Sequence, residues 1–332
     1  MFKLKQTSHD PTDTNYVGNS SISQDIQYVI SDHNYGKNNV KILEVVRNGP
    51  IHSIKELLVC TKLTLNSQKD YTHVFFFEGD NSDIIATDSQ KNTVYVLAKK
   101  HGIKSAEEFG LLLAKHFLTT YGHVKRAKIW IEESPWERLG YGSGPYAQLH
   151  NHAFVYTPTA IKTCEILLNR GADPIIKSGL TGLRVLKTTK SSFVNFVNDE
   201  FRSLPDQEDR IFSTIVRSQW EYSVCEGIDF DKISKIIKQI ILTCFAGEPI
   251  NGIESPSVQH TIYLANKEVL DNIPQIGWIE MEMPNKHYFN IDFSKLSKAV
   301  ENCQNDEIFL PATDPAGNIY CRLDRKHTNS KL

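Results

Sequence analysis

Residues 40–65 read VKILEVVRNGPIHSIKELLVCTKLTL, and this stretch decides the fold class. β-branched residues and leucines alternate in part with polar residues over residues 40–42 and again over residues 57–65, which is typical of β-strands. Asn48-Gly49-Pro50 lies between the two stretches and favours a turn. The sequence therefore predicts a long antiparallel hairpin.

The remainder of the first half predicts another strand followed by a helix. Residues 93–98 have a strand-like composition. Ser105-Ala106-Glu107-Glu108 is a capping box, in which the serine and the last glutamate each bind the other's exposed backbone N–H at a helix start. The helix is expected to end at Gly122. Its apolar face consists of Phe109, Leu112, Leu113 and Phe117.

The second half repeats this pattern of a strand followed by helices. Residues 182–188 predict a strand, and two apolar clusters farther along predict two helices. The first helix would bear Phe193, Phe196, Val197 and Phe201. The second would bear Ile233, Ile236, Ile237, Ile240 and Ile241. Two similar modules in tandem, each an antiparallel sheet with helices on one face, belong to the α+β class.

The chain is expected to divide into four parts. Residues 1–34 are rich in Ser, Asp, Asn and Thr with few large apolar side chains, which predicts a flexible extension. The first module is expected over residues 35–165 and the second over residues 166–320. Residues 321–332 form a tail that ends in Ser330-Lys331-Leu332. This tripeptide matches a peroxisomal targeting signal, which predicts a peroxisomal location and binding to the peroxisomal import receptor. The alternative is a basic tail whose last three residues match the signal by chance.

Composition excludes several classes of partner and cofactor. The 37 basic and 39 acidic side chains leave a net charge of -2, so no bulk field would attract nucleic acid or an anionic membrane. The most apolar stretch, residues 236–246, contains Lys238 and is shorter than the ~18 residues of a membrane span. The six cysteines form no CxxC pair, unlike those of a disulfide scaffold or a zinc site. The glycines at 140–144 precede Pro145 instead of a helix, which excludes a dinucleotide-binding motif.

Four groups of polar side chains lie between the apolar elements. Two of them are Tyr35-Gly36-Lys37 and residues 86–93. The others are Phe193 with Arg210, and residues 284–289. Taken singly, each group has a plain structural explanation: an exposed lysine, a turn, a core aromatic ring beside a surface arginine, and a hydrogen-bonded strand histidine.

Together with their flanking residues, these groups resemble the urate oxidase family. The matching segments follow the family's order and approximate spacing and cover nearly all of the chain from Tyr35 onward. They are YGKNNVKI, DNSDIIATDSQKNTVY, GLTGLRVLKTTKSSF, DRIFST, SVQHTIY and MPNKHYFNIDF. The resemblance implies tunnelling-fold (T-fold) modules that assemble into a homotetrameric barrel with active sites between subunits. It also implies oxidation of urate by O2 and water to 5-hydroxyisourate and hydrogen peroxide, with no metal and no organic cofactor.

The resemblance further implies a binding site for urate, which is planar and anionic. Phe193 would stack on the purine ring, and Arg210 would bind one edge with a planar fork of donors that lysine lacks. Gln259 would present its amide to the opposite edge, and Val258 would offer its backbone N–H. These residues would fix the ring without a metal.

O2 reacts slowly with closed-shell molecules unless they are electron-rich. The implied chemistry therefore needs a further proton removed from urate. Lys37 and Thr87 resemble the family's proton relay, with His287 as its third member. Asn285 and Thr87 match the pair that holds oxygen, and later water, above the ring. The backbone of Asp88 would contact the substrate, while its carboxylate braces the turn. Lys37, Thr87 and Asp88 are implied to come from one subunit, and all other site residues from its neighbour.

One departure from the family lies close before Thr87. Five residues, Val74 to Glu78, follow the Tyr-x-His segment at 71–73, where the family continues directly into Gly-Asp-Asn-Ser. The insertion has two possible effects. It lengthens a hairpin tip, at little cost in folding free energy, and leaves activity intact. Alternatively, it displaces Thr87, and the protein is then an inactive purine-binding relative.

Two other functions compete with this one. His150-Asn151-His152 places two imidazoles on one strand face, where copper or zinc could bind, although no third ligand is evident. The alternative for these histidines is hydrogen bonding within the module. A T-fold enzyme acting on pterins would ordinarily anchor its substrate with a glutamate, whereas the matched positions here are Arg210 and Gln259.

Overall fold

The computed structural model describes residues 30–66, 75–142, 148–312 and 314–326. Within these ranges, the residues from Asn34 onward belong to one unit. The predicted flexible extension, as far as residue 29, and the tripeptide Ser330-Lys331-Leu332 lie outside the described residues. No helix in the described ranges is long and apolar enough to span a membrane.

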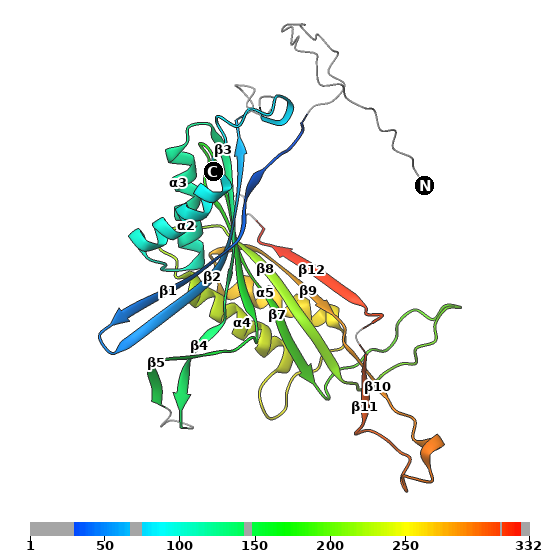
Figure 1. Cartoon of the computed structure of the whole chain (residues 1–332). Helices are drawn as coiled ribbons and strands as arrows, with labels where there is room; N and C mark the ends of the chain where they lie inside the picture. The colour runs from blue at the N-terminus through cyan, green and yellow to red at the C-terminus, as the bar shows by residue number, and fades with distance from the viewer. Residues whose placement is uncertain (1–29, 67–74, 143–147, 313, 327–332) are drawn as a thin grey trace, which may run out of the picture. The chain divides into compact units, whose positions relative to one another are not determined.

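An eight-stranded sheet forms the framework of this unit, in the order β1-β2-β3-β6-β7-β8-β9-β12 (Figure 1). Neighbouring strands pair antiparallel throughout. The strands are β1 (Tyr35–Asn48), β2 (Ile51–Leu65), β3 (Val124–Glu133), β6 (Ile161–Asn169), β7 (Ile175–Lys187), β8 (Phe212–Tyr222), β9 (Ile276–Pro284) and β12 (Asn318–Asp324). Two small hairpins extend away from this sheet (Figure 1). They are β4 (Trp136–Tyr141) with β5 (Gln148–Tyr156), and β10 (His287–Asn290) with β11 (Phe309–Ala312), with the short 3-10 helix η3 (Ser294–Leu296) before β11.

Two pairs of helices lie against one face of the sheet (Figure 1). They are α2 (Thr87–His101) with α3 (Ala106–Thr120), and α4 (Phe230–Ala246) with α5 (Val258–Asn272). The first pair packs on β1, β3 and β6, and the second on β7, β9 and β12. The order of two strands, two helices, a strand, a small hairpin and a strand therefore occurs twice. This confirms the predicted tandem of antiparallel modules. The first set of elements ends with β6 at Asn169, so the predicted boundary after residue 165 falls inside that strand.

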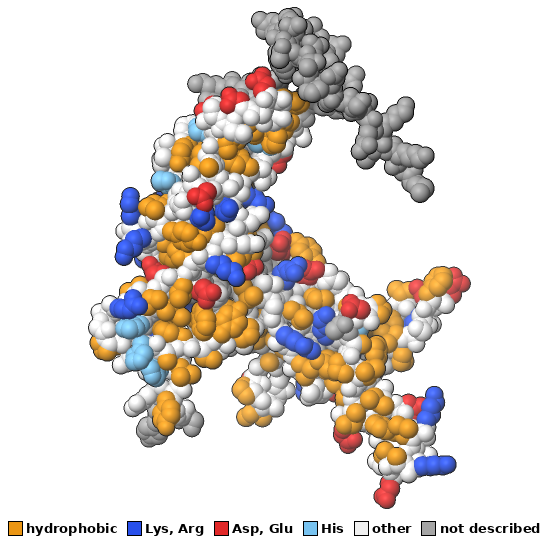
Figure 2. All heavy atoms as spheres, in the orientation of Figure 1, with side chains coloured by type: hydrophobic (Ala, Val, Ile, Leu, Met, Phe, Trp, Pro, Cys, Tyr) orange, Lys and Arg blue, Asp and Glu red, His pale blue; other side chains and the backbone are white. Residues whose placement is uncertain are grey.

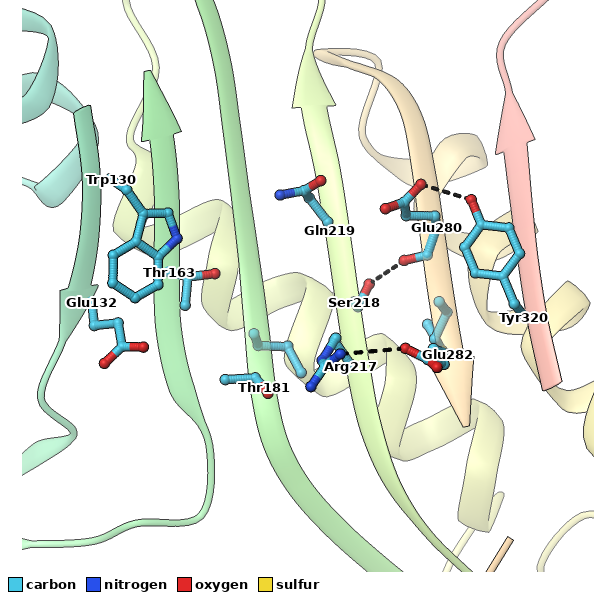
Figure 3. A pocket seen from close by; sticks show the side chains of 12 residues that line it. Trp130, Glu132, Thr163, Thr181, Arg217, Ser218, Gln219, Glu280, Glu282 and Tyr320 are labelled. Atoms are coloured by element: carbon cyan, nitrogen blue, oxygen red, sulfur yellow. Dashed lines mark hydrogen bonds and ion pairs between the residues drawn. The ribbon is translucent and has the colours of Figure 1, made fainter. Parts of the chain in front are cut away.

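The helices cover the apolar face of the sheet, where alternate strand residues are buried. On β3, Ile129 and Ile131 are fully buried, while Trp130 between them lies on the opposite face (Figure 3). Gly110 allows α3 to approach closely, because a Cβ there would lie 2.7 Å from Cγ1 of Ile166. The core therefore lies between the sheet and the helices.

Two local predictions in the first module are confirmed. β1 and β2 form the expected hairpin, and Gly49 in its turn has a φ of 57°, which favours glycine. Ser105 caps the helix as predicted, since its Oγ accepts a hydrogen bond from the N–H of Glu108 at 3.1 Å. The carboxylate of Glu108 accepts from the Ser105 hydroxyl at 3.2 Å, where the capping box predicts the backbone N–H as donor. The helix ends at Thr120, two residues before the predicted Gly122.

The strand predicted over residues 93–98 is wrong, because these residues lie within α2. Val94, Leu97 and Ala98 are buried while Tyr95 and Val96 are exposed. This spacing of three and four residues belongs to a helix that covers the sheet with one face. The burial of that face overrides the strand preference of the β-branched residues.

Of the two helices predicted in the second module, only the later one forms. In α4, Ile233, Ile237 and Ile241 are buried at a spacing of four. The segment over residues 193–201 is irregular, and its Val197 and Phe201 are exposed. Without an apolar face against the sheet, those aromatic and β-branched residues have no reason to become helical.

A buried ionic cluster joins the two helix pairs. Nζ of Lys162 on β6 lies 3.0 Å from Oε2 of Glu107 on α3 and 2.6 Å from Oδ1 of Asp231 on α4. Nζ of Lys55 lies 2.8 Å from the other carboxylate oxygen of Asp231. Burial lowers the pKa of Lys162, but the carboxylates of Glu107, Glu133 and Asp231 outweigh it and raise the pKa above its ordinary value. Since Lys162 therefore stays charged at neutral pH, it neutralises the fully buried Glu107.

We expect Lys162→Met to destabilise the protein by about 3–5 kcal/mol, because it leaves Glu107 buried without a counter-charge. The matched control is Lys128→Met, which removes the 2.8 Å ion pair to Glu165 on the more exposed side of the sheet. That change should cost at most ~1 kcal/mol. Urea denaturation at pH 7 measures both free energies of unfolding. Equal losses in the two variants would contradict the role of the cluster.

Candidate active site

Lys37, Thr87 and Asp88 lie where β1 and α2 begin, and we call them the relay half-site. Lys37 is the third residue of β1, and Thr87 and Asp88 are the first two residues of α2. The pKa of the Asp88 carboxyl is lowered, chiefly by a hydrogen bond from Lys91 and to a smaller extent by the charge of Lys37. The structure therefore brings these three predicted site residues into one neighbourhood.

The segment at Thr87 was predicted as a turn, and it is instead the start of a helix. Nζ of Lys91 donates to Oδ1 of Asp88 at 2.6 Å, and Nδ2 of Asn92 donates to Oδ2 at 3.0 Å. The Asp88 carboxylate thus braces the first helical turn, where a negative charge also complements the helix dipole. Its backbone remains available at the helix start.

The described part of the insertion packs beside the relay half-site. The ring of Phe75 lies 6.4 Å from that of Tyr35, centroid to centroid, and Phe75 packs against the core. The hydroxyl of Tyr35 accepts a hydrogen bond from the N–H of Ile85 at 3.1 Å, two residues before Thr87. The insertion therefore accompanies an ordered start of α2. Val74 lies outside the described residues.

Phe193 and Arg210 lie together at the other predicted part of the site. The backbones of Phe193 and Gln207 exchange two hydrogen bonds, at 2.8 and 3.0 Å, and the N–H of Arg210 donates to the carbonyl of Ser191 at 2.8 Å. The guanidinium carbon of Arg210 lies 5.2 Å from the centroid of the Phe193 ring. Burial lowers the pKa of Arg210, and its buried Nε has no hydrogen-bond partner among the described residues. A buried charged donor without a protein acceptor, on a side chain that lines a cavity, is suited to bind an anion.

The start of α5 is tied to the same segment. Ser191 and Ser255 form an isolated bridge, and the N–H of Ser192 donates to the carbonyl of Ser255 at 3.1 Å. Val258 and Gln259 are the first two residues of α5. The backbone N–H groups of a first helical turn have no intrahelical acceptor and attract anions.

Asn285 and His287 follow β9 and face the cavity beside Arg210. The N–H of Asn285 donates to the carbonyl of Gly317 at 2.8 Å, and the ring of His287 stacks 5.8 Å from that of Phe289. Arg210, Asn285 and His287 line one cavity of about 620 Å³, in the range that small ligands occupy. Together with Phe193, Val258 and Gln259 we call these residues the clamp half-site.

The two half-sites occupy different parts of the chain's fold. The relay half-site lies at the start of β1 and α2, while the clamp half-site lies around β8, α5 and β10 (Figure 1). No relay residue lines the cavity that holds Arg210, Asn285 and His287. One copy of the chain therefore brings the predicted site residues together in two groups and not in one.

One residue beside the clamp half-site, Asp209, was not singled out from the sequence. The Asp209 carboxylate accepts hydrogen bonds from Oγ1 of Thr189 at 2.5 Å, the N–H of Arg210 at 3.0 Å and the N–H of Ser191 at 3.3 Å. These bonds, with that from Thr189 the strongest, lower the pKa of Asp209. Asp209 therefore fixes the segment that carries Arg210. The sequence indicates this role only through the position of Asp209 next to Arg210 in the motif DRIFST.

The metal-site alternative finds no support in the described residues. The rings of His150 and His152 lie 4.6 Å apart, and His52 approaches His152 at 5.8 Å. Nδ1 of His150 accepts the N–H of His152 at 3.2 Å, which matches the hydrogen-bonding alternative. Over the described ranges, no group of three or more potential ligands is arranged to hold a metal ion.

A second hollow lies on the face of the sheet opposite the helices (Figure 3). Its polar groups pair with one another: the hydroxyl of Tyr320 donates to Oε2 of Glu280 at 2.8 Å, and Arg217 lies 3.6 Å from Glu282. None of the predicted site residues lines it. We therefore place the candidate site at the two half-sites.

Comparison with known proteins identifies the family. A family model described as Uricase matches residues 33–167 and 176–320. The chain is 50% identical over 344 residues to a uricase of Drosophila melanogaster, with 97% of this chain and 96% of that protein covered. It is 42% identical to a uricase of Oryctolagus cuniculus, with coverages of 92% and 96%. A crystal structure of uricase from Arthrobacter globiformis superposes with a TM-score of 0.80 at 31% identity, covering 92% of this chain and 98% of that one. This likeness confirms the predicted tandem T-fold, and the chain belongs to the uricase family.

Proposed function

We propose that the protein is a urate oxidase, which converts urate, O2 and water to 5-hydroxyisourate and hydrogen peroxide without a metal or an organic cofactor. The observation that carries the proposal is the buried, unpaired Nε of Arg210 beside the Phe193 ring, at a cavity shared with Asn285 and His287. Family membership supplies the chemical class, and this arrangement fits a flat anion.

The clamp half-site supplies what urate recognition requires. Phe193 offers a ring face for stacking, worth about 0.5–1.5 kcal/mol beyond burial if a purine behaves like an aromatic side chain. Arg210 supplies charged donors in a planar fork. The first turn of α5, with Val258 and Gln259, adds backbone N–H groups and a side-chain amide to bind the other edge of the anion.

The relay half-site supplies the proton transfer. In the proposed reaction, Lys37 withdraws a proton from urate through the hydroxyl of Thr87, which makes the substrate electron-rich enough to reduce O2. Asn285 and Thr87 hold O2, and then water, above the ring, and His287 passes protons through a bound water. Both electrons come from urate, so O2 leaves as hydrogen peroxide and water adds to the oxidised ring.

We further propose that the active protein is a homotetramer whose sites form where one copy's relay half-site meets another copy's clamp half-site. The separation of the two groups within one chain supports this assembly. Apolar side chains exposed on the projecting hairpins also support it, among them Tyr141, Leu149, Phe289 and Leu310 (Figure 2). Exposed apolar surface of this kind typically becomes covered by a partner.

The peroxisomal location and the import receptor are also proposals. They rest on the sequence Ser330-Lys331-Leu332. The proposed product gives that location a chemical reason, because peroxisomes destroy hydrogen peroxide. Nucleic acid and membrane are not proposed as partners, since the net charge of -2 gives no field to attract them.

The direct test of the proposed function follows the ultraviolet absorbance of urate with purified protein. We expect urate to be consumed with one O2 taken up and one hydrogen peroxide released per urate, and at the same rate after exhaustive chelation. No flavin or nicotinamide should be needed, because urate itself is the reductant. An inert protein would contradict the function, and activity restored only by added copper would contradict the cofactor-free chemistry.

Arg210→Lys should raise the KM for urate about 10- to 100-fold, because a point charge cannot replace the bidentate fork and leaves part of the purine edge unpaired. The matched control is Arg322→Lys, since Arg322 also lies over an aromatic ring, 4.0 Å from that of Trp278, but is paired with Asp324. Steady-state kinetics measure both variants. An unchanged KM in Arg210→Lys would remove Arg210 from the clamp.

A further inference from the structure

We propose that Gln90, a buried glutamine on α2, is a positioning residue for proton transfer: through Thr61 it holds Lys37 in register with Thr87. The inference rests on the proposed function, which assigns Lys37 and Thr87 their roles. Gln90 itself touches neither the cavity nor a reacting atom.

A chain of hydrogen bonds runs from the backbone of Lys37 to the segment before Thr87. The N–H of Lys37 donates to Oγ1 of Thr61 at 3.2 Å. That hydroxyl donates to Oε1 of Gln90 at 2.8 Å, and Nε2 of Gln90 donates to the carbonyl of Ile85 at 3.2 Å. We call Thr61 and Gln90 the bracket, because they connect β1 through β2 to the start of α2.

The position of Gln90 in α2 makes its amide unusual. Its buried neighbours on the helix are Val94, Leu97 and Ala98, so Gln90 lies in the stripe that covers the sheet. Both Gln90 and Thr61 are fully buried. A buried amide costs several kcal/mol unless it is hydrogen-bonded, and an apolar side chain would satisfy this position without that cost. We therefore attribute the presence of an amide at position 90 to its hydrogen bonds with Thr61 and Ile85.

The backbone around Lys37 shows why a side-chain bracket is needed. The regular pairing of β1 with β2 shifts register between Lys37 and Val40, where Asn39 adopts a φ of 58°. Bulges of this kind interrupt the ladder and redirect a side chain. At Gly36 the two strands approach so closely that a Cβ would lie 1.7 Å from the carbonyl oxygen of Thr61. The bracket fixes Lys37 where the ladder alone does not.

A second tie makes the same connection independently. The hydroxyl of Tyr35 accepts the N–H of Ile85, whose carbonyl accepts Nε2 of Gln90. Both backbone polar groups of Ile85 are therefore bound, its N–H by Tyr35 of β1 and its carbonyl by Gln90 of the bracket. Loss of Gln90 therefore leaves the fold with one tie and loosens the geometry between Lys37 and Thr87.

The test compares Gln90→Met and Thr61→Val, which remove the hydrogen bonds at nearly constant volume, with Thr61→Ser, which keeps the hydroxyl. The control is Asn266→Leu, because Asn266 is an equally buried amide on α5 that donates to the carbonyl of Cys321 at 3.0 Å. Each variant is assayed for kcat and KM with urate, and its thermal melt is recorded. Should Gln90→Met fail to fold, Thr61→Val against Thr61→Ser decides.

We expect Gln90→Met and Thr61→Val each to lower kcat about 10- to 100-fold, the effect of a misplacement near 1 Å, with the KM within about 3-fold of the parent. The double variant should be little worse than the worse single one, because both residues belong to one unit. Thr61→Ser should restore most of kcat, and Asn266→Leu should lower stability without this loss of kcat.

Unchanged kcat in folded Gln90→Met or Thr61→Val would overturn the inference, as would equal losses in Thr61→Ser and Thr61→Val. An equal loss of kcat in Asn266→Leu would show that any buried amide has this effect and would overturn it too. These outcomes leave the proposed function intact, provided that the parent protein consumes urate. A parent protein that leaves urate unchanged defeats the proposed function, and the inference with it.

Discussion

The apolar face of the eight-stranded sheet has to be covered, and the helices that cover it also place the candidate site. Thr87 is the first residue of α2 and Val258 is the first residue of α5. Because each helix is held to the sheet by its buried stripe, the position of its first turn is held as well. The packing of the core thus positions two helix N-termini, one at each half-site. The other polar residues of each half-site lie around its helix N-terminus.

The polar atoms that the core encloses divide into two kinds. Those of Gln90, Thr61 and Glu107 are satisfied within the chain and connect elements to one another. Nε of Arg210 is buried beside Phe193 without an acceptor among the described residues. Other buried polar atoms also lack a partner among the described residues, such as Nε1 of Trp220 and Oγ of Ser234. Arg210 differs from them because its unpaired group is charged and its side chain lines a cavity, and this combination favours the binding of an anion.

The sequence predicts those features that depend on local chemistry. The turn at Asn48-Gly49 and the helix cap at Ser105 need only neighbouring residues, and both form as predicted. Residues 93–98 were misjudged because Val94 and Val96 favour a strand locally, whereas contact with the sheet, a non-local effect, makes them helical. The segment after Phe193 was misjudged for the opposite reason, since it has apolar residues but no surface to cover.

The candidate site divides in the same way. Motifs identify Lys37, Thr87, Phe193 and Arg210, and the structure groups them into two half-sites, but their roles remain predictions. Gln90 could not be found from the sequence, because its polarity is unexpected only when residues 90, 94 and 97 are known to share one helix face. Asp209 is similar, since its three hydrogen bonds join segments that fold together only in the complete module.

The central claim is that one copy's relay half-site completes another copy's clamp half-site. Its most direct measurement assembles mixed oligomers from two inactive variants, Lys37→Met and Arg210→Met, and assays urate oxidation. If subunits mix at random, about a quarter of the sites combine two intact halves, so the mixture should regain about a quarter of the parent activity. A mixture as inactive as its components, although its subunits exchange, would show that both halves must come from the same chain and would contradict the account.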